Sequence, residues 1–203
     1  MKGDETEALR ARLDDLARRA GRLWTPLCSR FLTQEERSLA QRCARENGVL
    51  AAFDGGWEGA ERSQCCFYPD GLEPDFTGVW LEVSWNAKFA SVDHRALLGS
   101  VMALGMDRSL LGDMVIEGDH AYIRAVPELA ARLPQELTRV GSAAVKVRER
   151  SEPPAITPPK GTELRDTVAS LRLDSVLSSG MKTSRAKATE WIRQGAVQVN
   201  HTA

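Results

Sequence analysis

Basic and hydroxyl-bearing side chains gather at the start of a predicted helix near the C-terminus. The cluster comprises Lys182, Thr183, Ser184, Arg185 and Lys187. Thr183 or Ser184 can cap the helix, and the free backbone N–H groups at a helix start attract phosphate oxygens. The helix dipole favours anions at the same place. This combination predicts a contact with the backbone of RNA.

Short structural elements must hold that cluster in place. Residues 172–181 and 183–194 have the pattern of two short helices. Gly195 is typical of a helix end in the left-handed conformation, and Val197 and Val199 alternate as in a strand. The inner side of the second helix is apolar: Ala188, Trp191 and Ile192.

The same residues also have a purely structural interpretation. The basic side chains fit a solvated face, which is the usual role of a charge cluster, and Ser184 can be a cap alone. Arg172 and Asp174 are expected to orient one another or a helix end. We rank RNA contact above this interpretation because the whole pattern occurs in one frame.

That frame resembles the S4-type RNA-binding domain, also called the alpha-L motif. The resemblance implies binding of structured RNA, mostly ribosomal or transfer RNA. It also implies a further hairpin after the last strand, so we expect this domain to be incomplete, because the sequence ends at His201-Thr202-Ala203. The matching positions are Arg172, Leu173, Asp174, Leu177, Ser184, Arg185, Ala188, Ile192, Gly195, Val197, Val199 and Asn200. The expected RNA-binding residues are Arg172, Lys182, Thr183, Ser184, Arg185, Lys187, Arg193, Gln198 and Asn200.

Composition narrows the class of protein. The 203 residues carry a net charge of −1; residues 160–203 hold seven basic and four acidic residues, a balance of +3, which leaves −4 for the rest. Only the C-terminal part therefore has the charge expected of a nucleic-acid surface. The N-terminus lacks the order of a signal peptide, and no stretch is apolar enough to cross a membrane. We expect a cytoplasmic protein whose four cysteines are reduced.

The N-terminal part reads as a small mixed domain. Residues 4–23 have helical spacing of apolar residues, residues 33–36 form a capping box, and residues 49–53 and 63–68 read as strands. The glycine-rich loop 54–62 lies between the two strands. Trp57 and Arg62 in this loop could contact RNA or another ligand, but a turn with a packed Trp is the interpretation we favour.

The middle part alternates strands and helices. The order is strand 79–85, helix 92–104, strands 113–117 and 121–125, helix 127–133 and strand 138–147. This βαββαβ order predicts a ferredoxin-like or RRM-like domain. The pattern shows no base-stacking aromatic residues at the positions that RRM proteins use.

The expected fold class is α+β, with four parts. They are an N-terminal α+β domain (1–76), an RRM-like domain (77–148), a Pro-rich linker (149–162) and an S4-type domain (163–203). The two Pro-Pro pairs of the linker favour an extended, semi-rigid spacer.

Two further segments carry a more specific resemblance. The loop D-G-G-W-E-G-A-E-R (54–62) resembles a G-G-aromatic-x-x-A-E-R signature, and residues 93–114 resemble an H-R-x-x-L-G…R-x-x-x-G-D segment. With the C-terminal pattern, these resemble the bacterial YlmH family over about residues 30–200. The resemblance implies an RNA-binding protein linked to the large ribosomal subunit, to rescue of stalled nascent chains and to cell division. A second RNA or ligand contact is possible at Trp57, Arg62, His94, Arg95 and Arg108.

We expect no catalysis, because the sequence has no Ser-His-Asp spacing, P-loop or metal cluster. No cofactor or metal is expected. The expected partners are ribosomal RNA and/or tRNA on the large subunit, with possible protein partners in ribosome rescue or cell division. Two alternatives stay open: an RNA-modifying enzyme of the pseudouridine synthase type, and a protein-interaction adaptor linked to cell division. A general-base role for His94 is possible, although a residue at a helix start is more often a cap or a surface residue.

Overall fold

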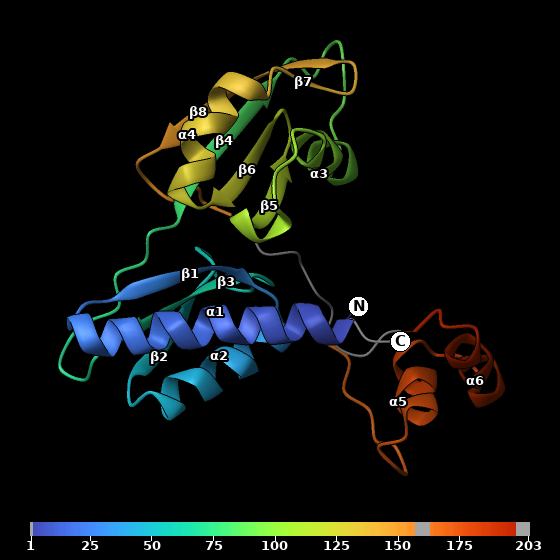
Figure 1. Cartoon of the computed structure of the whole chain (residues 1–203). Helices are drawn as coiled ribbons and strands as arrows, with labels where there is room; N and C mark the ends of the chain where they lie inside the picture. The colour runs from blue at the N-terminus through green and yellow to red at the C-terminus, as the bar shows by residue number, and fades with distance from the viewer. Residues whose placement is uncertain (1, 157–162, 198–203) are drawn as a thin grey trace. The chain divides into compact units, whose positions relative to one another are not determined.

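The computed structural model describes residues 2–156 and 163–197. The chain divides into two compact units, Met1–Pro158 and Pro159–Ala203 (Figure 1). The first unit contains two sheets, and the second contains two helices. Helices and strands both contribute substantially, so the expected α+β class is confirmed.

The N-terminal half of the first unit is a three-stranded antiparallel sheet covered by two helices (Figure 1). Its elements are α1 (Lys2–Leu23), β1 (Leu27–Leu32), α2 (Gln34–Glu46), β2 (Leu50–Asp54) and β3 (Ser63–Tyr68). The strand order is β1-β3-β2. Thr33 and Glu36 form the expected capping box: each side chain accepts a hydrogen bond from the other residue's backbone N–H, at 2.7 and 3.4 Å. The helices bury small and apolar side chains against Phe67 of β3, namely Leu13, Ala17, Ala20, Ala40, Cys43 and Ala44.

Strand β1 is absent from the sequence expectation. Its pairing with β3 shifts register between Cys28 and Phe31. A bulge of this kind breaks the alternation by which a strand is read from sequence. Ser29, Phe31 and neighbouring Leu32 are all buried, so burial does not alternate regularly along β1.

The second half of the first unit has βαββαβ order. Its elements are β4 (Val79–Trp85), α3 (His94–Ala103), a 3₁₀ turn (Arg108–Leu110), β5 (Leu111–Glu117), β6 (His120–Ala125), α4 (Pro127–Glu136), β7 (Arg139–Val140) and β8 (Ala143–Arg150). The strand order is β5-β6-β4-β8-β7. Both helices pack on one face of this sheet through a core that includes Leu81, Val83, Leu97, Val101, Ile123, Leu129 and Leu133. This is the ferredoxin-like arrangement that the pattern predicts.

Two turns fix the ends of these strands. Gly118, with φ of +64°, opens the two-residue loop between β5 and β6, as the Gly118-Asp119 signal predicts.

The prediction of a single strand over residues 138–147 is wrong. Gly141, with φ of +57°, turns the chain between β7 and β8, because glycine adopts this conformation without steric cost. Strand β8 then runs on to Arg150.

The second unit consists of α5 (Leu173–Gly180) and α6 (Arg185–Arg193). Ala188 is fully buried where the helices pack, while Leu177 and Ile192 are half-buried. Gly195, with φ of +69°, follows α6 in the left-handed conformation that was expected. Of the expected strand 197–199, only Val197 lies within the described residues.

Gly112 sits where the two halves of the first unit meet. A Cβ atom at this position would lie 2.7 Å from Phe31 Cε1 and 3.0 Å from Arg124 Cβ. Phe31 belongs to β1 but is buried in the core of the second half, with 1% of its surface exposed. Because the ring is packed in this core, an added Cβ would force the ring or the backbone to shift, and the close approach of the two halves therefore favours glycine here.

We predict that Gly112→Ala destabilises the protein by about 1–3 kcal/mol, because the added methyl group overpacks this contact. Thermal unfolding followed by circular dichroism should show a lower Tm. Gly99→Ala is the matched control: Gly99 lies in α3 with nothing within 4 Å of the added Cβ. Alanine is the better helix former by up to about 1 kcal/mol, so this variant should unfold at the same or a higher temperature. Equal Tm values for both variants would contradict the tight contact.

Candidate nucleic-acid interface

The start of α6 is capped by Ser184. Its Oγ accepts a hydrogen bond from the N–H of Lys187 at 3.3 Å. Thr183 has a different role, since its N–H donates to the Ser178 carbonyl at 2.9 Å and joins the connection to the end of α5. Of the two predicted caps, Ser184 is therefore the one used. The helix begins at Arg185, so Lys182 precedes it, with φ of +48°.

Asp174 connects the two helices of this unit. Its carboxylate accepts a hydrogen bond from Arg172 Nε at 3.0 Å and another from Arg185 Nη2 at 2.8 Å. The Arg185 guanidinium, followed by that of Arg172, lowers the pKa of Asp174 to about 2. The sequence interpretation paired Arg172 with Asp174 but did not include Arg185, which lies eleven residues further along.

Arg172 and Arg185 are fixed by Asp174, but their side chains stay exposed to solvent. Their side chains stay 72% and 59% exposed, whereas that of Asp174 is 11% exposed. Each guanidinium has five N–H donors, so donors remain for a ligand after the bonds to Asp174. The carboxylate therefore positions two cations at the helix starts while it cancels one of their two charges.

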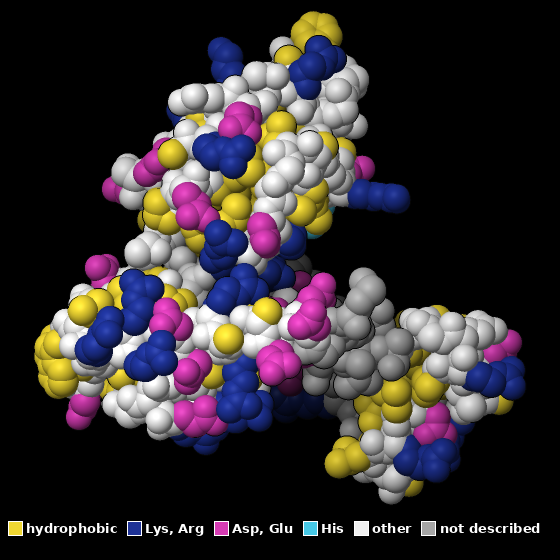
Figure 2. All heavy atoms as spheres, in the orientation of Figure 1, with side chains coloured by type: hydrophobic (Ala, Val, Ile, Leu, Met, Phe, Trp, Pro, Cys, Tyr) yellow, Lys and Arg dark blue, Asp and Glu magenta, His cyan; other side chains and the backbone are white. Residues whose placement is uncertain are grey.

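Among the other described cations of this unit, Arg165 pairs with Glu163 at 2.8 Å, whereas Lys182, Lys187 and Arg193 are exposed. None of these last three has an acidic partner within 4 Å among residues 2–156 and 163–197. Lys187 Nζ lies 5.4 Å from the ring centre of Trp191. In the view of Figure 2, basic side chains of this unit alternate with acidic and hydrophobic ones and form no continuous patch. The predicted contacts Gln198 and Asn200 lie outside the described residues.

The second group of candidate residues falls into separate environments. Arg62 Nη2 donates to the Phe31 carbonyl at 3.0 Å, and its Nε donates to the Leu111 carbonyl at 3.2 Å. Arg108 Nη1 donates to the same Leu111 carbonyl at 2.8 Å. Burial lowers the pKa of both arginines, and the neighbouring Arg62 lowers that of Arg108 further. Both guanidinium groups therefore hold backbone in place within the first unit.

Asp113 completes this arrangement, and the sequence interpretation did not include it among the contact residues. Its carboxylate accepts hydrogen bonds from the N–H groups of Glu61 and Arg62, at 2.7 and 3.1 Å. The two YlmH-like segments thus meet each other: the loop 54–62 is hydrogen-bonded to Leu111 and Asp113. In the sequence, each of the two segments combines glycines with an ionisable residue. Nothing in the sequence alone indicates that the two segments contact each other.

The remaining candidates are packed or exposed. Trp57 is half-buried, and its ring lies 3.7 Å from the position of a Cβ on Gly59, as expected for a packed Trp in a turn. His94 and Arg95 are exposed in the first turn of α3, where the cap is Asp93, whose Oδ1 accepts from the Ala96 N–H at 2.7 Å. Within the described residues, no group of three His, Cys, Asp or Glu side chains could hold a metal ion.

We predict that acid loosens the second unit through Asp174. Because its folded pKa of about 2 is below the ordinary value of 3.8, the ion pairs stabilise the unit fully above about pH 4. This stabilisation is lost as the pH falls through about 2. NMR signals of the Ala188 and Gly195 amides should report more unfolding of the wild type at pH 2 than at pH 5. Asp174→Asn should be less stable than the wild type at pH 5, and the gap should close toward pH 2. A constant gap would contradict the assignment.

We predict that Arg62→Ala destabilises the first unit by about 2–4 kcal/mol, because two backbone carbonyls lose charge-assisted hydrogen bonds. Arg95→Ala removes the same charge from an exposed site and should change stability by less than about 0.5 kcal/mol. Urea unfolding curves compare the two variants. An Arg62→Ala variant that is as stable as Arg95→Ala would show that Arg62 is free for a ligand.

Comparisons with known proteins agree with these units. Residues 72–152 match a family model described as the putative RNA-binding domain in YlmH, and residues 171–202 match the S4 domain. A protein of Bacillus subtilis named ribosome-associated protein quality control protein P2 is 34% identical over 174 residues, which cover 84% of this chain and 68% of that protein.

A solved structure supports the fold. It is named cell division protein ylmH from Streptococcus pneumoniae, and it matches with a TM-score of 0.59 at 22% identity over 72% of this chain and 91% of that one. At this identity the likeness concerns the fold alone. The sequence relationship to the Bacillus protein is close enough to show the family. The chain therefore belongs to the YlmH family and carries its putative RNA-binding domain followed by an S4 domain.

Proposed function

We propose that this protein is a non-catalytic RNA-binding protein of the ribosome. It would bind ribosomal RNA and/or tRNA on the large subunit and take part in quality control of stalled nascent chains, in the cytoplasm. The name of the Bacillus relative and the two RNA-binding family models support this function. We also propose that the chain has protein partners in ribosome rescue or cell division.

The observation that carries the proposal is the arrangement at the start of α6. Lys182 and Lys187 are exposed, and the first backbone N–H groups of the helix lie beside them, whereas exposed Arg193 is at the other end of α6. Asp174 holds Arg185 at this helix start and Arg172 at the start of α5, through bonds of 2.8 and 3.0 Å. Phosphate oxygens suit both kinds of donor. A folded RNA with closely spaced phosphates would use the fixed arginines and the free lysines together.

Three aspartates that are close to the candidate site residues in the sequence have structural roles. Asp93 is the cap of α3, Asp113 holds the loop 54–62, and Asp174 holds two arginines. A general acid or base needs a carboxylate or imidazole that can reach a substrate proton. These three carboxylates are engaged in structural hydrogen bonds.

The central prediction concerns Lys182 and Lys187. Co-sedimentation with large ribosomal subunits carrying peptidyl-tRNA should show binding of the wild type and weaker binding of the Lys182→Ala/Lys187→Ala variant. Each lost phosphate contact lowers the slope of log affinity against log salt by about 0.7–0.9, so a salt series should show a slope smaller by about 1.5. These two lysines are preferred to Arg185, because losing Arg185 would also break the bond to Asp174.

The control variant is Arg18→Ala/Arg19→Ala, which removes two exposed charges from α1. It should bind like the wild type, and circular dichroism should show that both variants are folded. If the wild type stays at the top of the gradient, the ribosomal function is wrong. If the wild type and the folded lysine variant bind with equal affinity and slope, the lysines are only a solvated face.

A further inference from the structure

The face of the β5-β6-β4-β8-β7 sheet opposite the helices carries a set of polar and aromatic side chains. Alternation along the strands places Leu81, Val83 and Ile123 in the core and their neighbours on the other face. The register pairs these neighbours across the strands: Glu82 lies opposite Tyr122 and Arg148, and Ser84 lies opposite His120 and Lys146. We name this surface, formed by Glu82, Ser84, His120, Tyr122, Lys146, Arg148 and Arg150, the open sheet face.

Glu82 is buried beneath the open sheet face and binds two of its arginines. It is 3% exposed, and its two carboxylate oxygens bind Arg148 Nη2 at 2.7 Å and Arg150 Nη1 at 2.6 Å. Burial alone raises the pKa of Glu82, but the hydrogen bonds from Arg150 and Arg148 outweigh it and leave the pKa below its ordinary value. The carboxylate therefore stays charged and fixes two guanidinium groups above the sheet.

Tyr122 supplies a flat aromatic surface in this arrangement. The Arg150 guanidinium lies 5.4 Å from the centre of its ring. Arg148 extends toward solvent, with 71% of its side chain exposed. Tyr122 lies on the third strand of the βαββαβ order, on the face away from the helices, where stacking aromatics occur in RRM proteins. The sequence interpretation missed it because β6 has a single aromatic residue and no motif around it.

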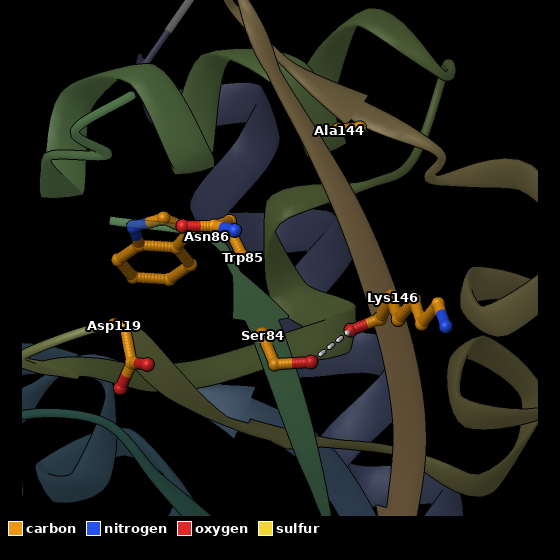
Figure 3. Close-up of a pocket in the computed structure, with 6 residues that line it drawn as sticks. All are labelled: Ser84, Trp85, Asn86, Asp119, Ala144 and Lys146. Atoms are coloured by element: carbon orange, nitrogen blue, oxygen red, sulfur yellow. Dashed lines mark hydrogen bonds between the residues drawn. The ribbon is translucent and has the colours of Figure 1, made fainter. Parts of the chain in front are cut away.

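One end of the open sheet face is closed and the other is open. At the closed end, Arg124 binds Asp54 of the N-terminal half at 3.1 Å and lies over Trp80, and a Cβ on Gly56 would be 2.7 Å from the Trp80 ring. At the open end lies a shallow hollow of about 470 Å³ (Figure 3), lined by Ser84, Trp85, Asn86, Asp119, Ala144 and Lys146. The Lys146 side chain extends outward from β8, away from Trp85 (Figure 3).

We propose that the open sheet face binds single-stranded RNA, with a base stacked near Tyr122 and Arg150 and phosphates beside Arg148 and Lys146. This proposal adds a second RNA-binding surface to the proposed function. It rests on that function because it takes RNA as the ligand. The family model over residues 72–152 is described as a putative RNA-binding domain but specifies neither a face nor residues.

The charges of the open sheet face decide which kind of RNA it fits. Lys146, Arg148 and Arg150 are its basic side chains and Glu82 is its acidic one, and two further carboxylates, Glu117 and Asp119, lie beside His120 at its edge. The resulting net charge is too small to attract a duplex through its phosphates alone. Base stacking on an aromatic ring adds affinity that does not depend on charge, and it requires an unpaired base. The hollow beyond Ser84 gives the next nucleotide room.

The test uses the full chain and fluorescent octamers of uridine and of adenosine, with a fully paired RNA hairpin for comparison. Tyr122→Ala should bind the octamers about five-fold or more weakly, as expected for the loss of one stacked base. Tyr122→Phe keeps the ring and should bind like the wild type. Lys146→Ala should weaken octamer binding, whereas Arg132→Ala on α4, on the helix-covered side, should not.

The Lys182→Ala/Lys187→Ala background separates this inference from the proposed function. In that background the octamers should still bind, and a 4-thiouridine octamer should crosslink to peptides within residues 79–150. Equal octamer binding by the Tyr122→Ala variant and the wild type, or crosslinks only outside 79–150, would overturn the inference. Capture of a protein on this face with no octamer binding would overturn it too. Failure of the wild type to sediment with ribosomes would count against the proposed function but leave these measurements readable.

Discussion

Carboxylates placed beneath pairs of guanidinium groups determine the geometry of both candidate RNA surfaces. Asp174 holds Arg172 and Arg185 in the second unit, and Glu82 holds Arg148 and Arg150 in the first. A buried carboxylate is costly unless it is paired, and two cations satisfy it better than one. The guanidinium groups lose rotational freedom in return. An RNA ligand then meets cations whose positions are already fixed, so less ordering entropy is lost on binding.

The net charge at each candidate surface is small. Residues 160–203 carry a balance of +3, in which the charge of Asp174 is already counted against the two arginines that it binds. On the open sheet face, Glu82 and the neighbouring Glu117 and Asp119 offset most of the charge of Lys146, Arg148 and Arg150. Long-range attraction is therefore weak at each surface, and recognition must rely on shape, hydrogen-bond geometry and stacking. This suits an RNA-binding protein that selects a structured site over RNA in general, because non-specific affinity comes mainly from phosphate neutralisation.

Local signals in the sequence predict local structure well. The Thr33 capping box, the Gly118 hairpin and the left-handed Gly195 each depend on residues within four positions, and each is confirmed. The helix start at Arg185 and its Ser184 cap follow from the same kind of signal. Asp113 with the loop 54–62, and Glu82 with β8, are more than fifty residues apart in sequence. Such pairs depend on strand order and register, which no single motif contains. Strand β1 escapes prediction for the opposite reason, because its bulge removes a local signal.

Few contacts at each surface need not mean weak binding by the whole chain. The two surfaces belong to different units, and the sequence between them contains the pairs Pro153-Pro154 and Pro158-Pro159. From this composition we predict an extended, semi-rigid spacer, which would limit the volume that a tethered unit explores. Once one of the two proposed surfaces is bound, the other would then meet RNA at a high effective concentration, and two modest affinities would multiply. This gain requires RNA sites at a spacing that the segment can reach. A ribosome presents structured and single-stranded RNA at fixed distances, whereas free RNA of mixed shapes does not, so tethering itself would contribute to selectivity.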